Sequence, residues 1–249
     1  MVPPVRGGVD SPRELRISSA FVELADTLVA DFDLPEFLHR LTRHCVDLLQ
    51  AVGAGVMLAG PDGRLRLLAS SSEQVRLLEL FELNGTQGPC LAAYRNGTTV
   101  ADTDLAAADP RWTAFAARAH HDGLRSVHAI PMRSREHVIG VLNLFDTAVG
   151  PLPHHDQQLG RALADVATIG LRQHDHVETH RGMSQQFQGA FATRLDIEQA
   201  KGLLAERLGI DPSEAFQRLR SHARDTDRTL AALARDVLTG QARQAATRA

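Results

Sequence analysis

The stretch EQAKGLLAERLGIDPSEAFQRLR, residues 198–220, decides the fold of the C-terminal part of the chain. Gly209 is typical of the residue that ends a helix, because glycine adopts the left-handed backbone conformation without strain. Asp211 and Pro212 then match the N-cap and the first position of a following helix. The stretch therefore predicts two helices joined by a tight turn. It also contains Lys201, the only lysine among the 27 Lys and Arg residues of the chain, and this isolation needs a physical explanation.

The residues that follow predict a third helix. An apolar face repeats at i, i+3, i+4, i+7 and i+8 in Leu230, Leu233, Ala234, Val237 and Leu238. Gly240 supplies another helix end. Residues 194–240 are therefore predicted to form an all-α unit of three helices, followed by a short tail at 241–249.

No strand pattern returns after Pro153, and a long helix is predicted to lead into the three-helix unit. Apolar residues at helical spacing mark it at Leu159, Leu163, Val166 and Ile169, and again at Phe187, Phe191 and Leu195. Residues 173–193 are predicted to be a helical linker that loosens or kinks near Gly182. Such a helix cannot bury its apolar stripe alone, so we expect a homodimer held by a parallel coiled coil.

Residues 15–172 predict an antiparallel sheet with helices packed on it, which makes the chain α+β. Apolar runs at 54–60 and 64–70 flank a turn signal, and runs at 126–132 and 138–145 flank a polar turn at Ser134–Glu136. A further strand is predicted at 98–103. Helices are predicted at 18–29 and after Asp33, a possible cap, and at 109–121. Residues 1–14 are rich in Pro, Gly and charge and are predicted to be a disordered tail.

Composition bounds the class of protein. The formal net charge is only −3, so any anion-binding surface must be local. The two cysteines, Cys45 and Cys90, are too few for a disulfide framework. The N-terminus lacks the apolar core of a signal peptide, and no apolar run approaches the roughly 18 residues that span a bilayer. We therefore expect a cytoplasmic protein with no membrane partner.

Helix geometry predicts a local cationic surface in the three-helix unit. Arg194 and Lys201, seven residues apart, fall on one flank of its first helix. Gln217, Arg220 and Arg224, at i, i+3 and i+7, fall on one flank of the second helix. A bound anion would relieve the repulsion between Arg220 and Arg224.

An alternative reading is that these are solvated charges. Glu198 and Glu206 are close enough in sequence to pair with them. The three-helix unit also contains no Trp or Tyr, so platforms for base stacking are not evident. Pattern alone therefore leaves both readings open.

Residues 194–238, RLDIEQAKGLLAERLGIDPSEAFQRLRSHARDTDRTLAALARDVL, closely resemble the ANTAR domain, an RNA-binding antiterminator module. The matching positions run in order with unbroken spacing: Ile197, Ala200-Lys201-Gly202, Leu203-Leu204, Ala215-Phe216, Leu219-Arg220, Ala223, Leu230 and Ala234. Asp227 departs from the family, many of whose members carry an uncharged or basic residue there. The resemblance implies a dimeric module that binds paired RNA stem-loops in nascent transcripts. Such binding stabilises the antiterminator form, so that a terminator hairpin does not fold.

The resemblance places Lys201 and Arg220 directly at the RNA. Helix geometry adds Arg194, Gln217 and Arg224, and the sixth candidate is Arg228, beside the departure at Asp227. Basic side chains at these positions would hold phosphates and loop bases splayed out of the stack.

Upstream, residues 18–172 resemble a GAF domain in NGTQGPCLAAYRNGTTVADTDLAAADPRW and GLRSVHAIPMRSREHVIGVLNLF. The resemblance implies a central antiparallel sheet with helices on both faces, and a small-molecule pocket between the sheet and residues 71–121. The candidates to line that pocket are Cys90, Tyr94, Trp112 and His128. The alternative for each is ordinary packing.

No metal, cofactor or catalytic residue is predicted. His174, His176 and His180 lack a ligand set at metal-binding spacing and are typical of solvated histidines. No Ser-His-Asp, HExxH or P-loop spacing occurs.

Together these features predict a signal-responsive, dimeric RNA-binding antiterminator that is not an enzyme. One alternative is a DNA-binding regulator, because ERLGIDPSEAF resembles a helix-turn-helix bend, although Arg228 and Arg235 beside Asp236 form a poor recognition face. Another alternative is a redox or small-molecule enzyme built on the sensor half. For that reading, a single pocket cysteine is too few for a thiol relay.

Overall fold

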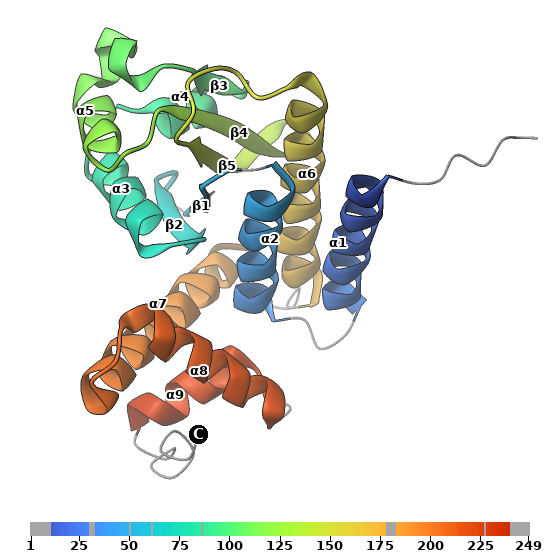
Figure 1. Cartoon of the computed structure of the whole chain (residues 1–249). Coiled ribbons are helices and arrows are strands. Elements are labelled where there is room, and N and C mark those ends of the chain that lie inside the picture. Colours follow the sequence, from blue (N-terminus) through green and yellow to red (C-terminus); the bar gives the residue numbers. More distant parts are fainter. Residues whose placement is uncertain are drawn as a thin grey trace, which may run out of the picture.

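The computed structural model describes residues 11–29, 33–49, 51–60, 62–85, 87–177, 183–226 and 228–239, without the side chains of residues 29 and 173–192. Two bodies are visible: a sheet domain, formed by α1–α6 and β1–β5, and a helical domain, formed by α7–α9 (Figure 1). Residues 1–10 of the predicted N-terminal tail and the whole predicted C-terminal tail at 241–249 lie outside the described residues, and so does Gly240, the predicted end of the last helix.

Five antiparallel strands form the sheet, in the order β2-β1-β5-β4-β3. Their bounds are β1 Gly53–Ala59, β2 Leu65–Ser70, β3 Val100–Asp102, β4 Ser126–Ser134 and β5 His137–Asp146. The predicted turn between the last two strands is confirmed, with Arg135 in the left-handed region at φ 56°. The antiparallel sheet predicted from the alternating runs is therefore present.

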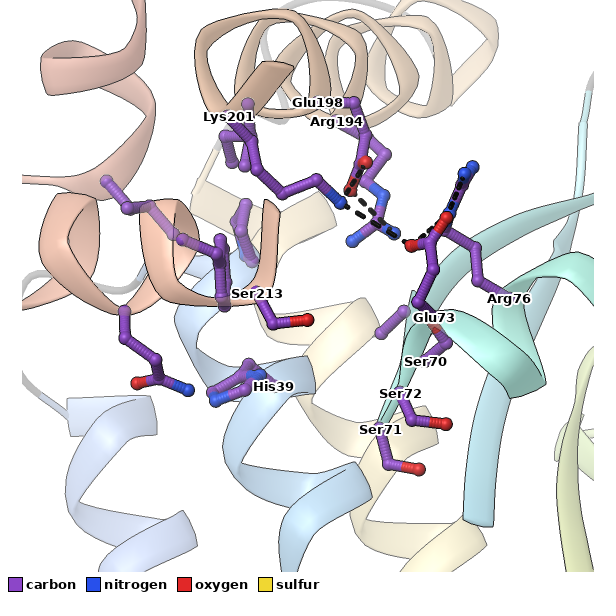
Figure 2. Close-up of a pocket in the computed structure, with 16 residues that line it drawn as sticks. His39, Ser70, Ser71, Ser72, Glu73, Arg76, Arg194, Glu198, Lys201 and Ser213 are labelled. Atoms are coloured by element: carbon purple, nitrogen blue, oxygen red, sulfur yellow. Dashed lines mark hydrogen bonds and ion pairs between the residues drawn. The ribbon is translucent and has the colours of Figure 1, made fainter. Parts of the chain in front are cut away.

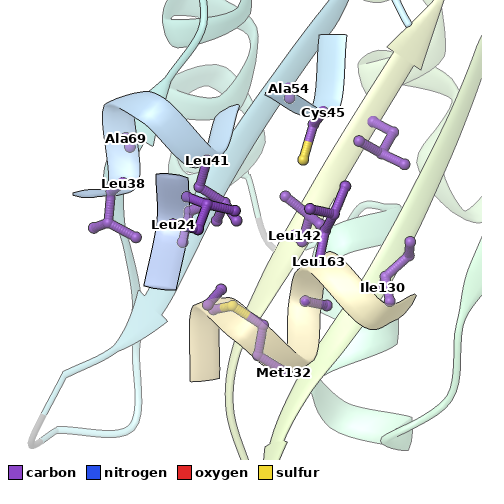
Figure 3. Packing of buried hydrophobic residues seen from close by; sticks show 14 of the residues in the cluster. Leu24, Leu38, Leu41, Cys45, Ala54, Ala69, Ile130, Met132, Leu142 and Leu163 are labelled. Atoms are coloured by element: carbon purple, nitrogen blue, oxygen red, sulfur yellow. The ribbon is translucent and has the colours of Figure 1, made fainter. Parts of the chain in front are cut away.

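Helices cover both faces of the sheet, as the sequence resemblance implied (Figure 1). One face carries α2 (Leu34–Leu49) and α6 (His154–Val177), with α1 (Pro12–Val29) packed against both. Leu38, Leu41 and Cys45 of α2 meet strand residues there, and these three side chains are buried (Figure 3). The first helix begins at Pro12, so residues 12–14, predicted to lie in a disordered tail, are helical.

The opposite face carries α3 (Glu73–Asn84), α4 (Pro89–Asn96) and α5 (Thr113–His121). Two short 3-10 turns, η1 (Leu105–Ala107) and η2 (Pro110–Trp112), precede α5. Phe115, Trp112 and Phe145 fill the larger of two small apolar clusters on this side. The two faces therefore have separate cores.

The helical domain has its own core. It consists of α7 (Met183–Leu208), α8 (Pro212–Asp225) and α9 (Leu230–Thr239). Gly209 ends α7 at φ 65°, and Asp211 Oδ1 accepts from Ser213 N at 2.7 Å to cap α8. The turn predicted from residues 198–220 is thus confirmed in its local chemistry.

The apolar stripe that was expected to pair two copies is only partly described. Ile169 of α6 and Leu195 of α7 are 54 % and 58 % exposed in the single chain. The side chains of Phe187 and Phe191, like those of His174 and His176, lie outside the described residues, and so does His180. The coiled-coil dimer remains a prediction.

Candidate nucleic-acid interface

The two domains meet along one end of α2 and the β2–α3 junction (Figure 1). Helix α7 contacts β2 and α2, and α9 contacts α2. A cavity of about 100 Å³ lies between the domains. Three of the six predicted RNA-contact residues line it, namely Arg194, Lys201 and Gln217. The predicted cationic surface therefore faces the sheet domain.

Lys201 extends from α7 toward α3 (Figure 2). Its Nζ lies 2.5 Å from Glu198 Oε2 and 3.9 Å from Glu73 Oε2. Arg194 Nη2 lies 3.0 Å from the other oxygen of Glu198. Only 14 % of the Lys201 side chain is exposed, so the cationic surface predicted from the sequence is not free in this arrangement. The reason is charge complementarity, since two carboxylates approach the ammonium from different domains.

Glu73 is held ready for this contact by its own domain. Arg76 Nε donates to Glu73 Oε2 at 2.8 Å. This hydrogen bond, with further attraction from Lys201 and Arg194, lowers the pKa of Glu73 below its usual value although burial opposes the change. Burial lowers the pKa of Arg194, which Glu198 partly offsets. The five charges form a network that crosses the domain boundary.

A second ion pair joins the domains through Arg220. Its Nε and Nη2 donate to the two carboxylate oxygens of Glu36, each at 2.8 Å. The side chains are only 7 % and 16 % exposed, so water screens this pair weakly. Burial raises the pKa of Glu36, but hydrogen bonds from Arg220 and Arg40 outweigh burial, and the net shift is downward. Glu36 is therefore an anion in the contact.

A helix cap and a ring contact complete the interface. Asp33 Oδ2 accepts from the backbone N–H of Leu230 at 2.8 Å, so Asp33 caps the first turn of α9. Asp33, which the sequence suggested as the cap of α2, directly precedes that helix, and its backbone oxygen accepts from Phe37 N at 2.9 Å. Its carboxylate also reaches the other domain. Phe216 meets the ring of His39 edge to face, with centroids 5.1 Å apart. Burial, with repulsion from Arg220, lowers the pKa of His39 to about 4, so this ring is neutral.

The remaining two candidates lie outside the contact. Arg224 is exposed on α8, where Nη2 lies 3.3 Å from Ser221 Oγ. Arg228 forms an ion pair with Asp236 at 2.6 Å. The structure thus brings Arg194, Lys201, Gln217 and Arg220 to the domain interface and leaves Arg224 and Arg228 apart from it.

The four candidates for the sensor pocket do not share one site. Cys90 and Tyr94 of α4 pack with Met57, and Cys90 Sγ lies 3.2 Å from Met57 Sδ. Burial raises the pKa of the Cys90 thiol well above its usual value. Trp112 Nε1 donates to Asp102 Oδ2 at 2.9 Å. These contacts are those of a packed interior rather than an open pocket.

His128 lies on the opposite face of the sheet from Cys90. Side chains alternate along β4, so Ala129 joins Cys90 while Ile130 and His128 turn toward the α2–α6 side. Nε2 of His128 accepts from Leu152 N at 3.2 Å, and the ring lines a separate cavity of about 460 Å³ with Arg161. The expectation that His128 lines the same pocket as Cys90 is wrong, because it required the His128 side chain to point toward the face of the sheet that carries Cys90.

Two buried carboxyl groups on α3 were not among the residues predicted from the sequence. Glu79 Oε1 accepts from Asn143 Nδ2 at 2.9 Å, and Oε2 has no hydrogen-bond partner among the described residues. Glu82 accepts from Cys90 N at 2.8 Å. Burial raises the pKa of Glu79 to about 8 and that of Glu82 to about 7. Their spacing of three within the apolar stretch LLELFELN was the available signal, because it places both on one helical face.

None of the described helices is long and apolar enough to cross a membrane. No group of three or more His, Cys, Asp or Glu side chains in the described part of the chain is placed to hold a metal ion.

Comparison with known proteins identifies both domains. Residues 33–172 match the family model of the GAF domain, and residues 185–238 match that of the ANTAR domain. No curated protein sequence gives a significant match.

Solved structures resemble the sheet domain. The GAF domain of a phosphoenolpyruvate-protein phosphotransferase from Coxiella burnetii is 13 % identical with a TM-score of 0.53, covering 69 % of this chain and 100 % of its own. The corresponding domain from Acinetobacter is 13 % identical with a TM-score of 0.50, covering 66 % and 98 %. These likenesses show the fold alone.

Proposed function

This chain belongs to the GAF-ANTAR regulators, and from that premise we propose that it is a homodimeric antiterminator that binds paired RNA stem-loops. It is a signal-responsive regulator built from two regulatory domains. RNA binding by the ANTAR domain would hold a nascent transcript in its antiterminator form, in the cytoplasm, so that the terminator hairpin does not fold. The GAF domain would receive the signal, from a small-molecule ligand or another input.

The observation that carries the proposal is the convergence of basic side chains on adjacent flanks of α7 and α8. Arg194, Lys201 and Arg220 meet carboxylates there, and Arg224 continues the row into solvent. Each of these cations would displace a counterion from an RNA phosphate, and Gln217 can hydrogen-bond to loop bases. Arg228 would extend the surface once released from Asp236.

A DNA-reading face on α9 is less well supported. Both of its neighbouring arginines are engaged, Arg228 with Asp236 and Arg235 with Asp196 at 3.4 Å. An enzyme built on Cys90 is also less well supported, because a buried thiol with a raised pKa is a weak nucleophile.

The direct test uses the exposed Arg224, which takes no part in the interdomain contact. RNA targets are first recovered from cells by crosslinking and sequencing, and the affinity of the full chain for one paired stem-loop is then measured at several salt concentrations. Arg224→Ala should weaken binding by about five- to tenfold, and should reduce the salt slope by roughly 0.7 to 0.9.

The matched control is Arg218→Ala. Arg218 lies on the same helix, two residues from Arg220 and so on the other side, and pairs with Glu214 at 2.7 Å. Its removal should change affinity by less than about twofold. Equal losses for the two variants would contradict the proposed RNA face, and displacement of the RNA by duplex DNA would favour the DNA-binding alternative.

A further inference from the structure

The ANTAR residues that the proposed function assigns to RNA are the ones that the GAF domain covers. Arg220 is paired with Glu36, and Lys201 reaches both Glu73 and Glu198. We infer that the GAF domain and RNA compete for one face of the ANTAR domain, with the carboxylates of Glu36 and Glu73 in the places of two RNA phosphates. The inference rests on the proposed function and adds to it the device that regulates it.

The chemistry of the two partners is alike. A guanidinium group donates two parallel hydrogen bonds to a carboxylate as it does to a phosphate. Glu36 receives this forked arrangement from Arg220, with both distances at 2.8 Å. Because only 7 % of the Arg220 side chain is exposed, a phosphate cannot reach it while Glu36 is in place. RNA binding at this face therefore requires the domains to separate.

Separation leaves few charges without a partner. Glu36 keeps Arg40, whose Nε lies 2.8 Å away, and Glu73 keeps Arg76. On the ANTAR side Lys201 and Arg194 keep Glu198. These local partners hold each group ionised in both arrangements, so the contact can open without stranding a buried charge. Arg220 is the exception, and RNA supplies the anion that it loses.

The apolar part of the contact is small. The buried apolar residues of the two domains form separate clusters. At α2 the domains are joined by Phe216 on the ring of His39 and by the Asp33 carboxylate, which accepts from the Leu230 amide. A largely polar interface within one chain is typical of domains that move relative to each other. The closed arrangement is therefore suited to an equilibrium rather than to a permanent joint.

Closure has a measurable cost for RNA affinity. If only a fraction of molecules is open, the apparent dissociation constant is the intrinsic one divided by that fraction. The full chain with Glu36→Gln and Glu73→Gln keeps the shape of both side chains but removes both charges. We expect it to bind RNA at least about tenfold more tightly than the unchanged chain.

The control must remove two negative charges elsewhere, because the loss of any carboxylate raises the affinity of the protein for the negatively charged RNA. Glu136 in the β4–β5 turn and Asp165 on α6 are exposed, and neither belongs to the ion pairs or the helix cap that join the domains. The chain with Glu136→Gln and Asp165→Asn should bind within about twofold of the unchanged chain. The difference between the two double variants isolates the effect of the contact from the effect of net charge.

The probe is one two-hairpin RNA selected in vitro on the Glu36→Gln, Glu73→Gln chain. Adding Lys201→Ala and Arg220→Ala to that chain should abolish the gain. If the unchanged chain binds this RNA as tightly, and still depends on Lys201, the proposed function stands and the competition is wrong. If no RNA is selected, or if binding ignores both basic residues, the proposed function itself is wrong and the inference falls with it.

Hydrogen exchange gives a second test of the competition, and it needs no variant. The Leu230 amide is bonded to Asp33 only across the domain contact. Saturating RNA should make this amide exchange several-fold faster in the unchanged chain, because RNA and the GAF domain exclude each other from the same face of the ANTAR domain. Unchanged or slower exchange on RNA binding would show that the domains stay together, and would overturn the inference.

Discussion

Replacing Glu79 by glutamine should change the pH dependence of the GAF domain's stability. Glu79 is fully buried, and its carboxyl group lies against Gly55, where a Cβ atom would come within 2.1 Å of it. Burial raises the pKa to about 8, and repulsion from Glu82 adds to the increase. The folded domain therefore holds this group as the neutral acid at neutral pH. Glutamine has the same shape, and its amide could donate to Asn143 Oδ1, which has no partner among the described residues.

Proton linkage gives the sign and the size of this dependence of stability on pH. The unfolded chain releases the Glu79 proton near pH 4.5, whereas the folded chain keeps it to about pH 8. Between these values the folded state binds more protons, so stability falls as pH rises. At about 1.4 kcal/mol per pH unit, the loss has an upper limit of about 5 kcal/mol. Relaxation of the buried site reduces this loss. We therefore expect the free energy of unfolding of Glu79→Gln to rise by about 3 kcal/mol relative to that of the unchanged chain between pH 5 and pH 8.5.

The assay is urea unfolding at a series of pH values, followed by tryptophan fluorescence. Trp112 is the only tryptophan in the chain and is 6 % exposed in the GAF core, so the signal reports that domain alone. Glu82, whose pKa is raised to about 7, leaves a smaller residual slope of the same sign. Glu136→Gln, at an exposed turn, is the control and should leave the profile unchanged. Parallel pH profiles for Glu79→Gln and the unchanged chain would refute the reasoning.

Three further outcomes are expected. Ile169→Lys with Leu195→Lys places charge on exposed apolar positions of the proposed coiled coil, and should shift sedimentation from dimer to monomer; identical sedimentation would count against that dimer. Asp33→Ala removes the cap of α9 and should weaken its first turn by about 1 kcal/mol, seen as faster exchange of the Leu230 amide, whereas equal rates would show that the cap contributes nothing. Both thiols are buried with raised pKa values, so iodoacetamide at pH 8 should label neither without denaturant, and rapid labelling of Cys90 in the folded chain would restore the redox reading.

Local chemistry made much of the fold predictable. Gly209 and Asp211 set the turn between α7 and α8 through their own backbone and side-chain preferences, which need no distant partner. The polar turn around Arg135 likewise fixed the β4–β5 hairpin. The face of the sheet toward which each strand residue points was harder to predict. The side chains of β4 alternate as expected, but nothing near His128 in the sequence indicates which face α6 covers.

The candidate site was predictable only in part, for a reason of distance along the chain. Helix periodicity could group Arg194 with Lys201, and Gln217 with Arg220, because each pair lies on one helix. It could not predict which residues of the other domain cover these side chains, since Glu36 lies 184 residues from Arg220. Contacts of that range depend on how two finished domains pack. The pairing with Glu198, by contrast, was a weighed alternative, because it is local to α7.

The isolated lysine now has a physical account. Its ammonium is a compact point charge on a flexible stem, so it can approach Glu198 of its own helix and Glu73 of the other domain at once. An arginine at this position would favour one forked pairing, as Arg220 does with Glu36. Lys201 can instead exchange one of its two anions for a phosphate while the other stays in place. Under the proposed competition, a residue that holds one anion in the closed form and another when RNA binds would benefit from that lack of directional preference.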